Sequence, residues 1–168
     1  MSRDTTQRRG RTANVARAER TSAGDAFSVL AITVLRLAGH LTAIGDALAR
    51  PAGQTSARWQ VLATVEDEPM TVAAIARSLG LTRQSVQRVA DLLDGDGLAV
   101  YVDNPDDRRA MLLQLTPRGR SALRTIQAAQ RGWADALGAE LGERELRAAS
   151  ATLARVMDAV VRRADAGD

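Results

Sequence analysis

The apolar residues of this chain recur at helical spacing over most of its length. Between residues 25 and 50 they fall three and four positions apart, which predicts one long helix with a continuous apolar stripe. Pro51 and Gly53 follow it and are expected to end it. A helix this long in a small chain often packs against a partner. The stripe consists of Phe27, Leu30, Ala31, Val34, Leu37, Ala38, Leu41, Ile44 and Leu48.

Three shorter helices are predicted next. Ser56 is the expected N-cap of the first, Thr71 of the second and Thr82 of the third, because hydroxyl side chains accept hydrogen bonds from the free amides of a first turn. Gly80 lies just past the end of the second helix, where a left-handed residue is favoured. Gly95 and Gly97 are expected to end the third helix. The residues expected to face inward are Trp59, Leu62, Val65, Val72, Ile75, Ala76, Leu79, Val86, Val89, Leu92 and Leu93.

The spacing of apolar residues then changes from that of a helix to that of the strands of a β-hairpin. Two short aliphatic runs, at residues 98–102 and 110–115, flank a polar segment that contains Pro105. This pattern predicts two strands joined by a long tip. The second strand is expected to direct one face inward through Met111, Leu113 and Leu115.

Two more helices complete the pattern. Thr116 and Pro117 are expected as the cap and first residue of one helix, and Gly142 separates it from the last. Their apolar sides are expected at Ala122, Ile126, Trp133 and Leu137, and at Leu146, Ala149, Leu153, Val156, Met157 and Val160.

The order of helix, short glycine turn, helix and hairpin is typical of a helix-turn-helix followed by a wing. We therefore expect a mainly α (α+β) fold, with a winged helix-turn-helix lobe and a two-stranded wing over residues 55–119. Residues 25–50 and 117–164 would form flanking helices. Residues 1–22 are expected to be a disordered basic arm, and residues 23–168 a single domain.

Composition excludes several kinds of chemistry. All 23 basic residues are Arg, and the chain has no Cys and one His, so disulfides, thiol chemistry and thiol-ligated zinc are excluded. One Phe, one Tyr and two Trp are too few for a base-stacking RNA or single-strand surface. No calcium-loop pattern, phosphate-binding glycine loop or nucleophile–base pair is present. We expect no catalytic site, no metal and no cofactor.

The net charge of +3 is unevenly distributed along the chain. Residues 1–22 hold six Arg against two acidic residues, whereas residues 58–119 hold seven Arg against nine. The arm could contact phosphates, or it could be a solvated tail. No run of 18 apolar residues and no signal sequence is found, so we expect a cytoplasmic protein without a membrane partner.

The third of the short helices has the polar first turns of a DNA-recognition helix. Arginine can bridge the O6 and N7 atoms of guanine, glutamine can pair with adenine, and hydroxyls and helix N-terminal amides favour phosphates. The alternative is an ordinary helical hairpin with a polar outer face. The candidate DNA contacts are Thr82, Arg83, Gln84, Ser85, Gln87 and Arg88.

The predicted wing resembles that of the MarR family of bacterial transcriptional regulators. Asp107 and Arg109 match the Asp-x-Arg that the family carries at the wing tip. The resemblance implies that Arg109 enters the minor groove and that Asp107 holds it there, and we expect Arg108 near a phosphate. The following Leu-x-Leu-Thr-x-x-Gly pattern of the family is matched by Leu113, Leu115, Thr116 and Gly119.

The resemblance covers roughly residues 27–162 and implies a homodimer held by the helices at 25–50 and 117–164. Such a dimer would bind a pseudopalindromic double-stranded DNA site and would act as a repressor released by a small aromatic or anionic ligand. Trp59 could stack on this ligand and His40 could line its pocket. The alternatives are a core-packed Trp59, a solvated or interfacial His40, and a winged-helix protein-interaction or scaffold module without sequence-specific DNA binding.

Overall fold

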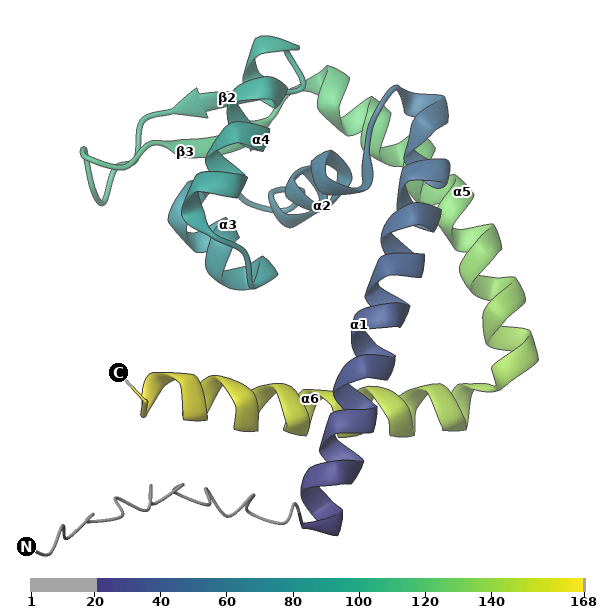
Figure 1. The fold of residues 1–168 in the computed structure, drawn as a ribbon. Helices are drawn as coiled ribbons and strands as arrows, with labels where there is room; N and C mark the ends of the chain where they lie inside the picture. The colour runs from purple at the N-terminus through teal and green to yellow at the C-terminus, as the bar shows by residue number, and fades with distance from the viewer. Residues whose placement is uncertain (1–20, 168) are drawn as a thin grey trace, which may run out of the picture. The chain divides into compact units, whose positions relative to one another are not determined.

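The structure, a computed structural model, describes residues 21–167, so the expected arm lies outside the described residues except for Thr21 and Ser22. The chain divides into two compact units, residues 1–39 and residues 40–168, which are treated separately below. The elements, labelled in Figure 1, are α1 (Ser22–Ala49), the 3-10 turn η1 (Arg50–Ala52), α2 (Ser56–Thr64), β1 (Met70–Thr71), α3 (Val72–Leu79), α4 (Arg83–Gly95), β2 (Ala99–Val102), β3 (Leu112–Leu115), α5 (Pro117–Leu141) and α6 (Glu143–Asp165). The mainly helical winged fold expected from the sequence is confirmed.

The described part of the first unit is the N-terminal portion of α1, whose surface is apolar on more than one side. The predicted stripe is exposed at Phe27, and Val29, Ile32 and Leu35 add exposed apolar surface elsewhere around the helix. By length and composition the segment Ser22–Ala52 could cross a membrane, although it holds no uninterrupted run of 18 apolar residues. These apolar faces need a covering surface.

The start of α2 differs from the prediction by one residue. Thr55, not Ser56, is the N-cap, and its Oγ1 accepts a hydrogen bond from the Arg58 amide at 3.3 Å. Ser56 is buried, and its own amide donates to Asp46 Oδ1 at 2.7 Å. Either hydroxyl could cap a helix, so the packing of Ser56 beside Gly45 decides which one does.

The predicted boundaries of the helix-turn-helix are confirmed. Thr71 Oγ1 accepts from the Ala74 amide and Thr82 Oγ1 from the Ser85 amide, both at 3.2 Å. Gly80 adopts the left-handed conformation, with φ of 64°, between α3 and α4. Short-range capping signals therefore set the turn that presents α4.

The sheet has three antiparallel strands in the order β1-β3-β2, one more than predicted. The extra strand, β1, pairs Met70 with Leu113 and is too short to show an alternating pattern. Leu113 and Leu115 face the core as expected. Met111 does not: it precedes β3 and is 48% exposed, so its assignment to the inner face was wrong.

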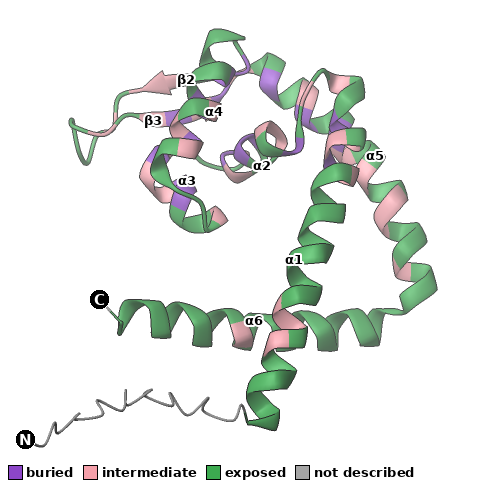
Figure 2. Ribbon diagram, viewed as in Figure 1, coloured by how far each residue is buried: buried purple, intermediate pink, exposed green. Residues whose placement is uncertain are grey.

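The core of the second unit lies beneath the helix-turn-helix and the sheet (Figure 2). On α4 the inner face runs through Val86, Ala90 and Leu93. Leu92 was expected to face inward but is 59% exposed, because it lies about 120° around the helix from that face. The largest fully buried side chains are Leu62, Ile75, Leu93, Leu113, Leu123, Ile126, Val61, Val65 and Val86.

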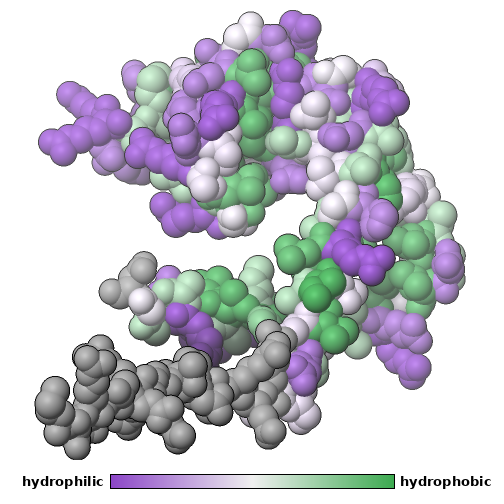
Figure 3. All heavy atoms as spheres, viewed as in Figure 1, coloured by the Kyte–Doolittle hydropathy of each residue, from purple (hydrophilic) through white to green (hydrophobic). Residues whose placement is uncertain are grey.

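The C-terminal helices α5 and α6 extend away from this core. On α5, Leu123 and Ile126 are buried, whereas Leu137, expected on the buried side, is exposed. None of the residues of α6 is buried (Figure 2), and its hydrophobic side chains form part of the surface in Figure 3. The exposed large apolar residues of α6 are Leu146, Leu153, Met157, Val160 and Val161.

Gly119 lies close against the backbone of Leu98. A Cβ atom at this position would overlap the carbonyl oxygen of Leu98 and would lie 3.1 Å from Leu115 Cδ2. Thr116 fixes the same junction, since its Oγ1 donates to the Gly97 carbonyl at 2.8 Å and accepts from the Gly119 amide at 3.1 Å. Only glycine fits here without moving the backbone.

We therefore expect Gly119→Ala to lower the free energy of unfolding by about 1–3 kcal/mol, the usual cost of overpacking. Gly132→Ala is the matched control, because no atom lies within 4 Å of a Cβ there and alanine favours a helix by up to about 1 kcal/mol. Urea denaturation followed by circular dichroism measures both. Equal stabilities of the two variants would contradict the packing argument.

Candidate nucleic-acid interface

The first turn of α4 presents a helix N-terminus whose hydroxyl groups are already engaged. Ser85 Oγ donates to the Thr82 carbonyl at 2.8 Å, and Thr82 Oγ1 lies 3.1 Å from Ser85 Oγ. Arg83, Gln84 and Arg88 are exposed instead. Thr82 and Ser85 therefore shape the N-terminal end of α4. The three exposed side chains project from the helix. A sixth predicted contact, the half-buried Gln87, is described below.

The wing tip is ordered by aspartate and asparagine turns. Asp107 Oδ1 accepts from the Arg109 amide at 2.9 Å, and Asn104 Oδ1 accepts from the Asp106 amide at 3.0 Å. Both Arg108 and Arg109 are exposed. Asp107 therefore constrains the backbone at Arg109, which is a different contact from a carboxylate that holds the guanidinium itself.

A groove of about 360 Å³ separates α4 from the wing. Arg83 lines it from α4 and Arg109 from the wing, so residues 26 positions apart in the sequence share one surface. Two guanidinium groups make this groove attractive to phosphate or to a groove edge of DNA. Its lining is Thr71, Val72, Ala73, Arg83, Gln87, Tyr101, Arg109, Ala110 and Met111.

Tyr101, which sequence reasoning did not select, links α4 to the wing. Its hydroxyl donates to Asp91 Oδ1 at 2.9 Å and lies 2.7 Å from Gln87 Nε2. Burial, then the hydrogen bond to Asp91 and the charge of that carboxylate, raise the pKa of Tyr101 from 10.0 to about 12. The contact spans separate elements, so no local sequence signal could have revealed it.

The opposite end of α4 is held by one ion pair and one hydrogen bond to a backbone carbonyl. Arg58 of α2 forms an ion pair with Asp96, which follows α4, and the Arg118 guanidinium donates to the Asp96 carbonyl at 2.9 Å. The Arg58 side chain is only 17% exposed. Asp96 is 54% exposed, so solvent screens the pair in part, and its role is to link α2 to the residue that follows α4.

The two residues predicted to line a ligand pocket do not line either of the two hollows described for residues 21–167. Trp59 is half-buried and packs against the core of the lobe, and His40 is exposed. Neither lines the groove beside the wing or a second hollow of about 680 Å³ at the corner between α5 and α6. The ligand role of both residues stays a prediction.

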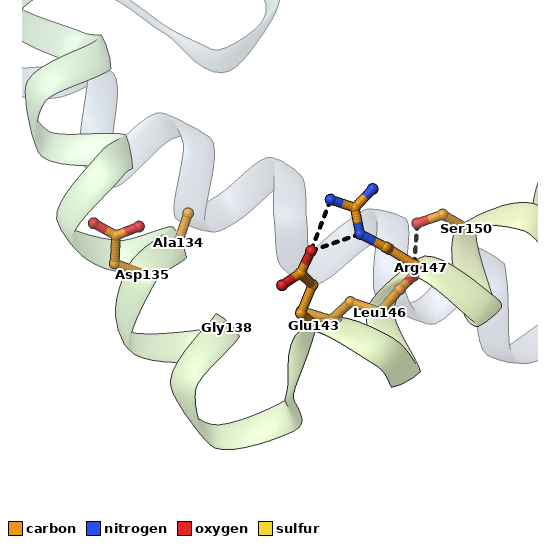
Figure 4. Close-up of a pocket in the computed structure, with 7 residues that line it drawn as sticks. All are labelled: Ala134, Asp135, Gly138, Glu143, Leu146, Arg147 and Ser150. Atoms are coloured by element: carbon orange, nitrogen blue, oxygen red, sulfur yellow. Dashed lines mark hydrogen bonds and ion pairs between the residues drawn. The ribbon is translucent and has the colours of Figure 1, made fainter.

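The hollow at the corner of α5 and α6 holds polar groups that already have partners (Figure 4). Arg147 Nε donates to Glu143 Oε1 at 2.8 Å, and Ser150 Oγ donates to the Leu146 carbonyl at 2.8 Å. Asp135 faces the same space. Within residues 21–167, no group of three or more His, Asp or Glu side chains gathers as a metal site would require.

Comparison with known proteins identifies relatives of this chain. Residues 52–110 match the MarR family. The uncharacterized protein Rv2011c of Mycobacterium tuberculosis is 47% identical over 102 residues, which span 61% of this chain and 71% of that protein.

Two solved structures of similar fold contain DNA. The transcriptional repressor CouR, bound to a 23-mer duplex, is 26% identical with a TM-score of 0.69, over 83% of this chain and 99% of that one. The M. tuberculosis regulator MosR, in complex with DNA, is 27% identical with a TM-score of 0.65, over 77% of this chain and 96% of that one.

The Tyr101 contact predicts a pH dependence of the free energy of unfolding. Because its pKa is raised in the folded chain, the unfolded chain releases this proton first, and the free energy of unfolding should fall as the pH rises from 10 towards 12. Below pH 10 the stabilisation is fully present. Tyrosinate absorbance reports the titration directly, since Tyr101 is the only tyrosine in the sequence.

We expect half-titration of the folded chain near pH 12, and near 10 when urea unfolds it. Tyr101→Phe should remove this part of the pH dependence of stability. A folded chain that titrates near 10 would contradict both the burial of the Tyr101 hydroxyl and its hydrogen bond to Asp91.

Proposed function

We propose that this chain, which belongs to the MarR family of transcription regulators, acts as a homodimeric repressor that binds a pseudopalindromic DNA site. The family and fold are those of transcription regulators rather than of enzymes. The observation that carries the proposal is the groove shared by Arg83 of α4 and Arg109 of the wing.

The arrangement of charge supports sequence-specific binding to DNA. α4 would enter the major groove, where Arg83, Gln84 and Arg88 can reach base edges or phosphates. Arg109 would enter the adjacent minor groove, with Arg108 near a phosphate. Thr82 and Ser85 would present the amide end of α4 to the backbone. Residues 58–119 carry more acidic than basic side chains, so binding there depends on these placed arginines rather than on a basic surface.

The exposed apolar helices support a homodimer. α6 has no buried residue, and apolar side chains such as Leu153 and Met157 are exposed along it. Exposed apolar surface of this extent marks an interaction site. A second copy, related by a two-fold axis, would cover it and would place two α4 helices about one DNA turn apart.

The proposal includes release of the DNA by a small aromatic or anionic ligand. Trp59 offers an aromatic face at the start of α2, and His40 offers a polar side chain on α1. A ligand that binds one spacing of the two α4 helices better than another would shift the dimer away from DNA. We place this regulator in the cytoplasm, with the DNA that it binds.

Arg109→Ala should weaken binding to a specific DNA fragment by about 1–3 kcal/mol, the scale of one good groove contact. The fragment is first isolated by passing sheared genomic DNA over the immobilised protein, and affinity is then measured by fluorescence anisotropy. Arg131→Ala, an exposed arginine on α5, is the matched control and should bind normally.

If the unmodified protein and the Arg109→Ala variant bind retained and random DNA equally weakly, the regulator proposal is wrong. That result would favour a winged-helix protein-interaction module instead.

A further inference from the structure

The two glutamines of α4 that the sequence places at the DNA differ in their surroundings. Gln84 is exposed, and its side chain makes no hydrogen bond with any residue in the described part of the chain. Gln87 is half-buried, and its Nε2 lies 2.7 Å from both Asp91 Oδ1 and the Tyr101 hydroxyl. A glutamine that reads adenine must donate from Nε2 and accept at Oε1 together. The donor of Gln87, Nε2, is already hydrogen-bonded within the protein.

The direction of every hydrogen bond in this contact is fixed by chemistry. Asp91 Oδ1 can only accept, and it receives one hydrogen from Gln87 Nε2 and one from the Tyr101 hydroxyl. The phenol oxygen then accepts the second Nε2 hydrogen. Turning the amide around would place Oε1 against the carboxylate oxygen, so the orientation of the Gln87 side chain is determined. The three residues form a closed ring of hydrogen bonds.

The ring joins two elements that would touch DNA separately. Gln87 and Asp91 belong to α4, and Tyr101 belongs to β2, which leads to the wing tip. Tyr101 also packs against the core and pairs with Leu113 of β3. The hydroxyl therefore fixes both wing strands relative to α4, on the wall of the groove that Arg109 also lines.

Resting on the proposed function, we propose that Gln87 and Tyr101 are positioning residues. They hold the wing, and with it Arg109, at a fixed offset from α4. Gln84 is then the glutamine of α4 that is free to read a base. The predicted contacts then have two roles: some contact DNA, and others set the distance between α4 and the wing.

The test compares full-length variants on the retained genomic fragment and on its single-base-pair changes. Gln87→Ala and Tyr101→Phe should each weaken binding by roughly threefold to tenfold, the scale of one hydrogen bond, and the double variant by no more than either. Base preference should be unchanged at every position. Gln84→Ala should instead flatten the preference at one base pair of each half-site.

Two further measurements separate positioning from a general loss of stability. In an Arg109→Ala background, Tyr101→Phe should cost no further affinity, because the contact that it positions is gone. Without DNA, amide hydrogen exchange in β2 and β3 should be faster in both Tyr101→Phe and Gln87→Ala than in the unmodified chain.

The proposal is overturned if Gln87→Ala flattens the preference at one base pair while Tyr101→Phe leaves affinity unchanged. Unchanged exchange in both variants would overturn it as well. If the unmodified protein retains no fragment above random DNA, the proposed function fails, and the exchange measurement alone then decides whether the ring holds the wing.

Discussion

The close approach of Gly119 to the carbonyl oxygen of Leu98 brings the base of the wing against the first turn of α5. Thr116 closes the same junction through hydrogen bonds to Gly97 and Gly119, and the Leu98 amide donates to the carbonyl of Leu93 on α4 at 2.8 Å. The end of α4, the two wing strands and the start of α5 therefore meet at one point. The relative placement of α4 and the wing depends on this junction because both elements extend from it.

From this junction, two further contacts determine how α4 and the wing lie together. The ion pair between Arg58 and Asp96 holds the C-terminal end of α4, and the Tyr101 hydroxyl ties the middle of the helix to β2. Arg83 and Arg109 then line a common groove, and the contacts just described hold the elements that carry them. All 23 basic residues of the chain are arginines, whose planar donors suit groove edges and phosphates, so under the proposed function a few arginines on well-packed elements would take the place of a broadly basic surface.

Local chemistry made much of the fold predictable, and contacts between distant segments account for what was missed. The caps at Thr71 and Thr82 and the left-handed Gly80 follow from the residues themselves. The choice of Thr55 over Ser56 depends on the contacts of Ser56 with Gly45 and Asp46, ten or more positions earlier, and β1 is too short for a pattern. Likewise, the polar face of α4 was visible in the sequence, but the engagement of Gln87 by Tyr101 is a tertiary contact with no sequence signature.

Under the proposed function, two copies of this chain present two such pairs of α4 and wing to one DNA site. Hydroxyl-radical footprinting of the unmodified protein on the retained genomic fragment tests it most directly. A dimer on DNA should give two symmetric protected half-sites whose centres lie about one helical turn, roughly 10 base pairs, apart. A single protected half-site, or protection that does not depend on sequence, would contradict it.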